Sequence, residues 1–303
     1  MDEFFKHLMP EWKDLILETQ ILTGGITNRL YRVRTSKGEE YVVRHYGDKT
    51  ELFINRDVEM ENLQRMEVCG VTPKLIKYLP DKRITIVEYI PGLPLKNQDF
   101  MNERFWELIV RPIKIVNRSR VVLPFVFHPK VEVKRLYKIL EGMNLNYPEF
   151  DLKGTINILV KIDEIAQIPH SQYVPCHNDL LADNFILVSD EGKYKEPMYL
   201  IDWEYAGMGT PYYDLADMFQ EILVPREVEE NILRIYWEDE NMDYNIYMTN
   251  LFKPFPDIYW FLWSLIQLNI SSIEFDYYNY GKIKYENAKK NIKYLREYYN
   301  LEL

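Results

Sequence analysis

The chain has 303 residues, of which 47% are hydrophobic and 28% charged, and this ordinary globular composition excludes a mostly disordered protein. It carries 37 Lys and Arg residues against 47 Asp and Glu residues, so its formal net charge is −10. An acidic surface excludes broad binding to nucleic acid or to an anionic membrane, although it is compatible with a local basic pocket for phosphate. Two cysteines provide neither a disulfide framework nor zinc-ligand spacing.

The location of the protein is also constrained by its sequence. The first residues include acids where a signal peptide would carry bases, and no apolar segment of the required kind follows. The most apolar stretch, residues 258–266, is much shorter than the roughly 20 residues that span a bilayer, so we interpret it as a buried helix. We therefore expect a cytoplasmic protein with no stable membrane insertion and no nucleic-acid partner.

The N-terminal part favours β structure with one helix. Residues 40–46 and 83–90 are rich in β-branched and aromatic side chains, and each segment is followed by turn-forming residues, which predicts two strands. Between them, the pattern predicts a helix over residues 55–67 that stops before Gly70.

After Pro94 the pattern becomes mainly helical. The predicted elements are amphipathic helices over 101–117, 130–142 and 153–168, short strands near 185–188 and 198–201, and helices from there to the C-terminus. We predict an α+β protein with two lobes. A small antiparallel β-sheet with one helix would occupy residues 1–93, and a larger, mainly helical lobe residues 94–303. The cleft between two such lobes is a common place for a ligand.

The strongest chemical signal is the H-x-D-x4-N spacing of His177, Asp179 and Asn184, followed by the apolar residues 185–188 and, after a second apolar segment, by Asp202. In phosphoryl transfer, a carboxylate such as Asp179 accepts or orients the proton of an attacking hydroxyl. Asn184 and Asp202 offer the hard oxygen ligands that Mg²⁺ takes, and a hairpin would bring them together. Taken alone, the spacing also fits a His–Asp turn with a capping Asn.

Two features of the N-terminal part match this chemistry. The segment Thr23-Gly24-Gly25-Ile26-Thr27-Asn28 lies between apolar stretches, and its glycines and hydroxyls suit a loop that contacts phosphate, although a plain hairpin turn has the same composition. Arg44, in the middle of a predicted strand, can bind phosphate and pair with an acid of the following helix, for which we choose Glu59. A surface arginine on an edge strand is the alternative.

Several of these segments resemble eukaryotic choline and ethanolamine kinases. The resemblance is carried by residues 44–52, 55–59, 260–267 and 270–280, and it extends over residues 21–95 and 174–285. It implies a two-lobed, protein-kinase-like fold. It also implies Mg²⁺- and ATP-dependent phosphorylation of the hydroxyl of choline or ethanolamine, which is the first step in making phosphatidylcholine or phosphatidylethanolamine.

The same resemblance implies roles for individual residues. Asp179 would be the catalytic base, Asn184 and Asp202 would bind Mg²⁺, and Arg44 with Glu59 would form the ion pair beside the phosphates. ATP would be bound by Gly24, Gly25, Thr27, Asn28 and Arg44, with the backbone of Glu88 and Ile90 at the adenine. The amine would be bound by Asp179, Tyr205, Glu221, Trp260, Trp263 and Tyr280.

The aromatic residues support an amine site on their own chemistry, because indole and phenol faces attract ammonium groups. Trp260 and Trp263 are three residues apart and would lie on one face of a helix, while Glu221 would add a negative charge. Asp214, in the segment 212–217, would brace the loop. An aromatic stripe at helical spacing is nevertheless more often plain core.

The leading hypothesis is therefore an ATP-dependent phosphotransferase for a small amino alcohol. A phosphotransferase of the same fold for another small alcohol, such as an aminoglycoside or a sugar, is the second hypothesis, and the aromatic set argues against it. The third is a catalytically silent nucleotide-binding protein, which the intact Asp179, Asn184 and Asp202 argue against. A protein kinase fits least, because the G-x-G-x-x-G and A-P-E segments are missing. The preferred amine and a homodimeric state are left open.

Overall fold

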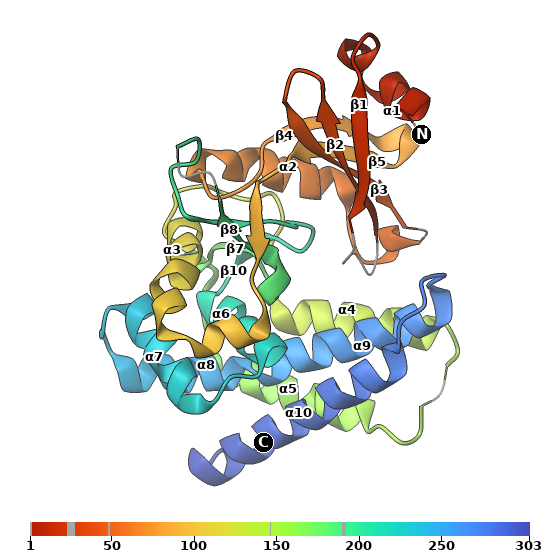
Figure 1. Ribbon diagram of the computed structural model, residues 1–303. Helices are drawn as coiled ribbons and strands as arrows, with labels where there is room; N and C mark the ends of the chain where they lie inside the picture. Colours follow the sequence, from red (N-terminus) through yellow and green to blue (C-terminus); the bar gives the residue numbers. More distant parts are fainter. Residues whose placement is uncertain (1, 23–27, 48, 146, 190–191) are drawn as a thin grey trace.

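The fold is seen in a computed structural model that describes residues 2–22, 28–47, 49–145, 147–189 and 192–303. A twisted sheet with one long helix forms the smaller lobe, and a set of packed helices forms the larger one (Figure 1). The two-lobed α+β fold predicted from the sequence is therefore confirmed.

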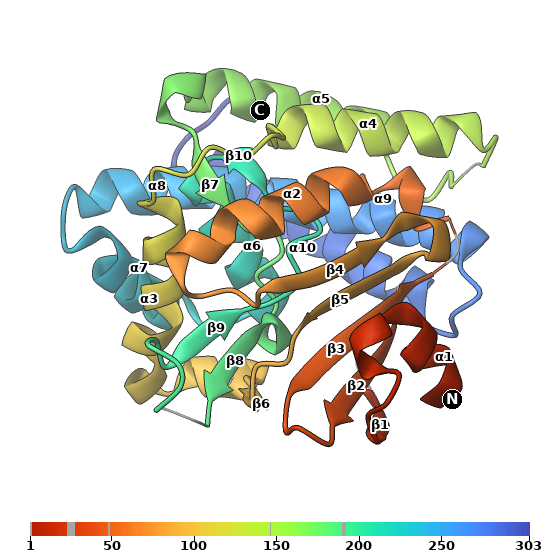
Figure 2. The same ribbon diagram turned by 90° about the horizontal axis from the view of Figure 1, so that it is seen from above.

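The smaller lobe is built on an antiparallel sheet with the strand order β1-β2-β3-β5-β4. Its strands are β1 (Leu17–Leu22), β2 (Asn28–Thr35), β3 (Glu40–Tyr46), β4 (Leu75–Leu79) and β5 (Ile84–Glu88), and its helices are α1 (Asp2–Leu8) and α2 (Arg56–Met66). The Asn55 side chain caps α2 by accepting from the N–H groups of Asp57 and Val58. The predicted strands and helix correspond to β3, β5 and α2, whereas α1 and β4 were not predicted. Seen from above, α2 lies between β4 and the larger lobe (Figure 2).

The larger lobe combines short strands with long helices. Its strands are β6 (Gly92–Pro94), β7 (Val174–Cys176), β8 (Phe185–Val188), β9 (Met198–Leu200) and β10 (Gly207–Gly209). Its helices are α3 (Trp106–Asn117), α4 (Pro129–Gly142), α5 (Leu152–Ala166), α6 (Pro211–Ile222), α7 (Arg226–Trp237), α8 (Met242–Phe252), α9 (Pro254–Ile270) and α10 (Tyr277–Tyr298). The helix predicted over 101–117 begins later as α3, because Asn102 is extended and caps a short 3₁₀ turn before it.

Helix α9 is the centre of the larger lobe. All of its residues from Pro254 to Gln267 are buried, which confirms that the apolar stretch 258–266 is a core helix. Helices α4, α6 and α10 pack around it, and α10 runs beside it in both views (Figures 1 and 2). Within the described part of the chain, no helix combines the length and apolar character needed to cross a bilayer.

The close approach of α10 to α9 depends on Gly281. A Cβ atom built on Gly281 would lie 3.2 Å from Phe261 Cδ2 and in collision with the Ser264 hydroxyl oxygen, and both of these residues belong to α9. A side chain at position 281 would therefore push the two helices apart.

We predict that Gly281→Ala lowers the free energy of unfolding by about 2 kcal/mol, since overpacking outweighs the better helix propensity of alanine. Chemical denaturation would measure this change. Gly142→Ala is the matched control, because a Cβ atom there meets nothing within 4 Å, and this variant should be neutral or slightly stabilising. Adding Ser264→Ala should recover part of the loss in Gly281→Ala; no recovery would contradict the steric explanation.

Candidate active site

The loop after β7 carries Asp179 and is held in place by Asp214 of α6. The two carboxylate oxygens of Asp214 accept from the backbone N–H groups of His177, at 3.2 Å, and Asn178, at 2.8 Å. The Nδ2 group of Asn117 donates to Asp214 at 3.1 Å from α3. The brace predicted for Asp214 is confirmed, and the loop is fixed from two helices.

A second buried carboxylate connects this loop to the aromatic helix α9. Asp217 accepts from the Leu180 N–H and from the Trp260 Nε1–H, each at 2.8 Å, with a different oxygen for each. Because Leu180 follows Asp179 directly, Asp217 fixes the predicted base relative to the Trp260 indole. Burial, followed by the charges of Asp217 and Asp202, raises the pKa of Asp179 well above its ordinary value.

The predicted hairpin is present as β8 and β9, and Asn184 and Asp202 flank the same end of its two strands. The strands are antiparallel, and the Ile201 N–H donates to the Asn184 carbonyl at 3.0 Å. The His177 ring holds the same segment through a 2.9 Å hydrogen bond between Nε2 and the Ile201 carbonyl. Asp202 itself has a left-handed backbone with φ of 67°, which turns the chain directly after the strand.

The donor atoms at this hairpin fit Mg²⁺. The Asn184 Nδ2 group donates to the Asp179 carbonyl at 2.8 Å, which leaves the amide oxygen as the atom available to a cation. The Asp202 carboxylate comes from the facing side of the hairpin, and its Oδ1 accepts from Arg44 at 2.6 Å. Amide and carboxylate oxygens are the ligands that Mg²⁺ takes in proteins.

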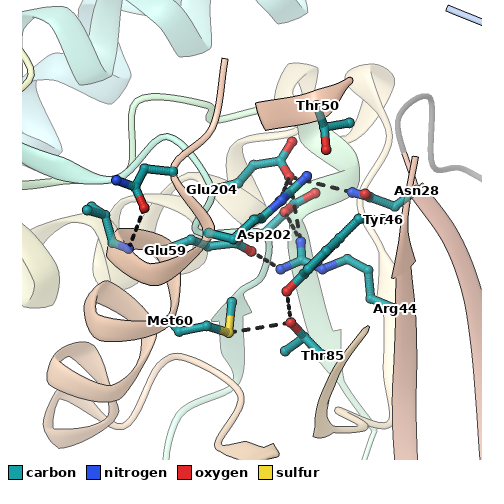
Figure 3. Close-up of polar contacts among 12 residues, drawn as sticks. Asn28, Arg44, Tyr46, Thr50, Glu59, Met60, Thr85, Asp202 and Glu204 are labelled. Carbon is teal, nitrogen blue, oxygen red and sulfur yellow. Dashed lines mark hydrogen bonds and ion pairs between the residues drawn. The ribbon is translucent and has the colours of Figure 1, made fainter. Parts of the chain in front are cut away.

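Arg44 connects the two lobes through a buried ion-pair network (Figure 3). From β3 its guanidinium pairs with Glu59 of α2 and with Asp202 of the larger lobe, and the Arg44 and Glu59 side chains are only 11% and 1% exposed. The ion pair between Arg44 and Glu59 that we expected from the sequence is therefore present. Arg44 is not the exposed edge-strand arginine of the alternative, because β3 lies inside the sheet.

The sequence analysis missed two members of this network. Arg56 donates to Glu59 at 2.6 Å and to Glu204 at 2.9 Å, so Glu59 is shared by two arginines. The three carboxylates of Glu59, Asp202 and Glu204 offer oxygens within 4.8 Å of one another, which resembles a metal site. Arg44 and Arg56 already pair with all three carboxylates, so the arrangement is that of an ion-pair network. The i,i+3 spacing of Arg56 and Glu59 was the available sequence signal.

The predicted nucleotide-binding residues are placed in part. Gly24, Gly25 and Thr27 lie outside the described residues. Asn28 begins β2, and its Nδ2 group lies 3.5 Å from Glu204 Oε2. Glu88 ends β5 with its N–H donating to the Lys74 carbonyl, and Ile90 follows as a buried residue where the chain passes between the lobes.

The predicted aromatic residues gather around α9. The ring centroids of Trp260 and Trp263 are 5.8 Å apart, Tyr205 lies 5.1 Å from Trp260, and Tyr280 lies 6.4 Å from Trp263. The two indoles are only 4% and 5% exposed and pack edge to face, so they also serve as core. The Trp263 Nε1–H is buried without a hydrogen-bond partner among the described residues.

Glu221 has a resident cation. Its Oε1 accepts from the Tyr280 hydroxyl at 3.3 Å and pairs with Lys284 Nζ at 2.5 Å. The sequence analysis predicted a carboxylate here for the amine and missed Lys284. Lys284 lies one helical turn after Tyr280, and this spacing was the sequence signal that could have identified Lys284.

The comparisons with known proteins agree with this geometry. The profile of the choline/ethanolamine kinase family matches residues 19–242. The chain belongs to this family. It is 27% identical to mouse ethanolamine kinase 2 over 311 residues, which cover 94% of this chain and 79% of that protein.

Solved structures of the family share the fold. The Plasmodium vivax ethanolamine kinase superposes with a TM-score of 0.79 at 24% identity, covering 94% of this chain and 87% of that one. The choline kinase LicA of Streptococcus pneumoniae gives the same TM-score and identity, with coverage of 97% and 99%. At this identity the structural likeness establishes the fold alone.

We predict that Glu59→Gln lowers the free energy of unfolding by about 3 kcal/mol, because it leaves two buried guanidinium groups without their shared charge. Glu61→Gln on the same helix is the control: its pair with Arg65 is exposed, so the loss should stay below about 0.5 kcal/mol. Urea denaturation of both variants measures the difference, and equal losses would contradict a special role for Glu59.

Proposed function

We propose that this protein transfers the γ-phosphoryl group of ATP to the hydroxyl of ethanolamine or choline, giving ADP and the phosphorylated amine. The single observation that carries the proposal is the position of Asp217, which hydrogen-bonds both to the Asp179 loop and to the Trp260 indole. A proton acceptor for a hydroxyl thereby lies beside aromatic rings suited to an ammonium group.

The chemical step assigns one task to each group. The acceptor oxygen attacks the γ-phosphorus, the bond to the bridging oxygen of ADP breaks, and the hydroxyl proton passes to Asp179. Asp179 is surrounded by the charges of Asp217, Asp202 and Glu221, so a bound ammonium group favours its ionised form.

The proposed reaction also assigns roles to the residues that would bind ATP and Mg²⁺. Asn184 and Asp202 would hold Mg²⁺, which supplies charge neutralisation for the phosphates. Arg44, positioned by Glu59, would bind phosphate, and the backbone at Glu88 and Ile90 would meet the adenine. Residues 1–93 would act as the nucleotide-binding lobe together with Gly24, Gly25, Thr27 and Asn28, and residues 94–303 as the catalytic lobe.

An acceptor panel tests the proposal. ADP release should require Mg²⁺ and should rise strongly with ethanolamine or choline, but not with an aminoglycoside or a simple sugar. Family membership and the rings of Tyr205, Trp260, Trp263 and Tyr280 support an amine acceptor. ADP release that depends on an aminoglycoside would contradict the proposal. Stabilisation against heat by ATP and Mg²⁺ without ADP release for any acceptor would favour the catalytically silent nucleotide-binding protein.

Asp179→Asn should lower kcat by at least about a hundredfold, because the amide cannot take up the hydroxyl proton. Asp183→Asn is a matched control in the same loop, since that side chain is exposed, and its kcat should stay within about twofold of the wild type. Steady-state ADP release measures both values. A near-normal kcat for Asp179→Asn would refute the role of the base.

Trp263→Ala should mainly raise KM for the amine, by about tenfold, with a smaller effect on kcat, because a cation–π contact acts on the ground state and the transition state alike. Trp237→Ala is the control, since Trp237 stacks on Tyr212 at 5.1 Å and is not among the proposed amine-site rings. Both assays are run below the melting temperature of each variant. A KM equal to that of the Trp237 variant would place the amine elsewhere.

A further inference from the structure

The amine side of the site contains a lysine that no step of the proposed reaction uses. Lys284 lies on α10, and its side chain is only 5% exposed. A buried ammonium group is costly unless charges and hydrogen bonds compensate it, so its surroundings are informative.

The Lys284 ammonium is bound as an amine ligand would be. Its Nζ pairs with Glu221 Oε1 at 2.5 Å, donates to the Gln220 carbonyl at 2.8 Å and lies 5.6 Å from the centroid of the Tyr280 ring. A carboxylate, a carbonyl and an aromatic ring therefore surround it, all from α6 and α10.

The two oxygens of Glu221 are used unequally. The Lys284 ammonium and the Tyr280 hydroxyl both engage Oε1. No other described residue donates to the second oxygen, Oε2. Lys284 and Tyr280 thus meet the carboxylate at the same oxygen, and Oε2 has the capacity to accept a hydrogen bond.

Two further acids explain why the cation is needed. Asp217 and Asp257 are both fully buried near Lys284, and its charge opposes the rise in pKa that burial causes in each. Asn291 donates to Asp257 at 3.0 Å and to the Gln220 side chain at 2.7 Å. Without Lys284, Glu221 would face these acids with no opposing charge at its Oε1.

We infer that Lys284 is a positioning and specificity-determining residue of the amine site: it holds Glu221 through Oε1 so that Oε2 is presented to the ammonium group of the acceptor. This inference rests on the proposed function. A primary ammonium group has N–H donors for Oε2, whereas a quaternary one has none and relies on ring faces and charge alone. Correct orientation of Glu221 therefore matters more for ethanolamine than for choline.

The test compares KM and kcat for the two amines in Lys284→Met, Lys284→Arg and the wild type. Lys284→Met should raise KM for ethanolamine about tenfold and KM for choline less than about threefold, because only ethanolamine loses an oriented, charge-assisted hydrogen bond. Lys284→Arg keeps the charge and should restore both values to within about threefold of the wild type.

Two controls separate positioning from general destabilisation. Lys253 is a second buried lysine, paired with Glu229 at 2.5 Å, so Lys253→Met should lower the melting temperature without changing either KM. In a double-mutant cycle, adding Lys284→Met to Glu221→Gln should raise KM for ethanolamine little further, because both changes remove the same contact. If Lys284→Met fails to fold, Lys284→Gln replaces it, since its amide can still donate to the Gln220 carbonyl.

The outcomes are distinct. The inference alone is overturned if Lys284→Met leaves KM for ethanolamine unchanged, or if it raises KM for ethanolamine and KM for choline equally. It is also overturned if the effects of Lys284→Met and Glu221→Gln on KM for ethanolamine multiply in the double variant. A wild type that releases no ADP with either amine overturns the proposed function and this inference with it.

Discussion

One buried carboxylate determines how the two lobes meet at the proposed nucleotide site. Glu59 accepts from Arg44 of β3 and from Arg56 of its own helix, and these arginines reach Asp202 and Glu204 of the other lobe. Such pairs are poor evidence for stability, because desolvation cancels much of the Coulomb attraction. These ion pairs instead fix the relative positions of β3, α2 and the end of the β8–β9 hairpin.

The amine side repeats this principle with a different cation. Lys284 stands among Glu221, Asp217 and Asp257, as the two arginines stand among Glu59, Asp202 and Glu204. In each cluster the acids outnumber the resident bases by formal charge. The excess lies where the proposed reaction brings cations, namely Mg²⁺ on one side and an ammonium group on the other. Bound cations would offset part of this excess.

The sequence predicted the features that depend on local pattern. The spacing of Asn184 and Asp202 around two apolar segments requires a hairpin, and the position of Arg44 in a strand before a helix predicted its pair with Glu59. Contacts between distant segments were missed, because no periodicity encodes them: Arg56 and Glu204 are 148 residues apart. The spacing of Lys284 and Tyr280 could have placed Lys284 on the same face of α10, but its pairing with Glu221 of another helix could not be predicted. The Trp263 indole packs against two rings of α10, Tyr277 and Tyr280, and Gly281 permits the close approach of that helix.

In the proposed reaction, the position of Asp217 would also limit the length of the acceptor. Its two hydrogen bonds fix the Asp179 loop relative to Trp260, so the base cannot move independently of the aromatic wall. Ethanolamine and choline both have two carbons between the nitrogen and the hydroxyl. When the nitrogen lies at Glu221 and the rings, only a hydroxyl at the matching distance reaches the base. A longer amino alcohol would place its oxygen out of line with the γ-phosphorus, and misplaced reacting atoms are costly in rate. In the proposed reaction, rigid coupling of Asp179 to Trp260 would thus select for spacer length, while Glu221 and the rings would select for charge.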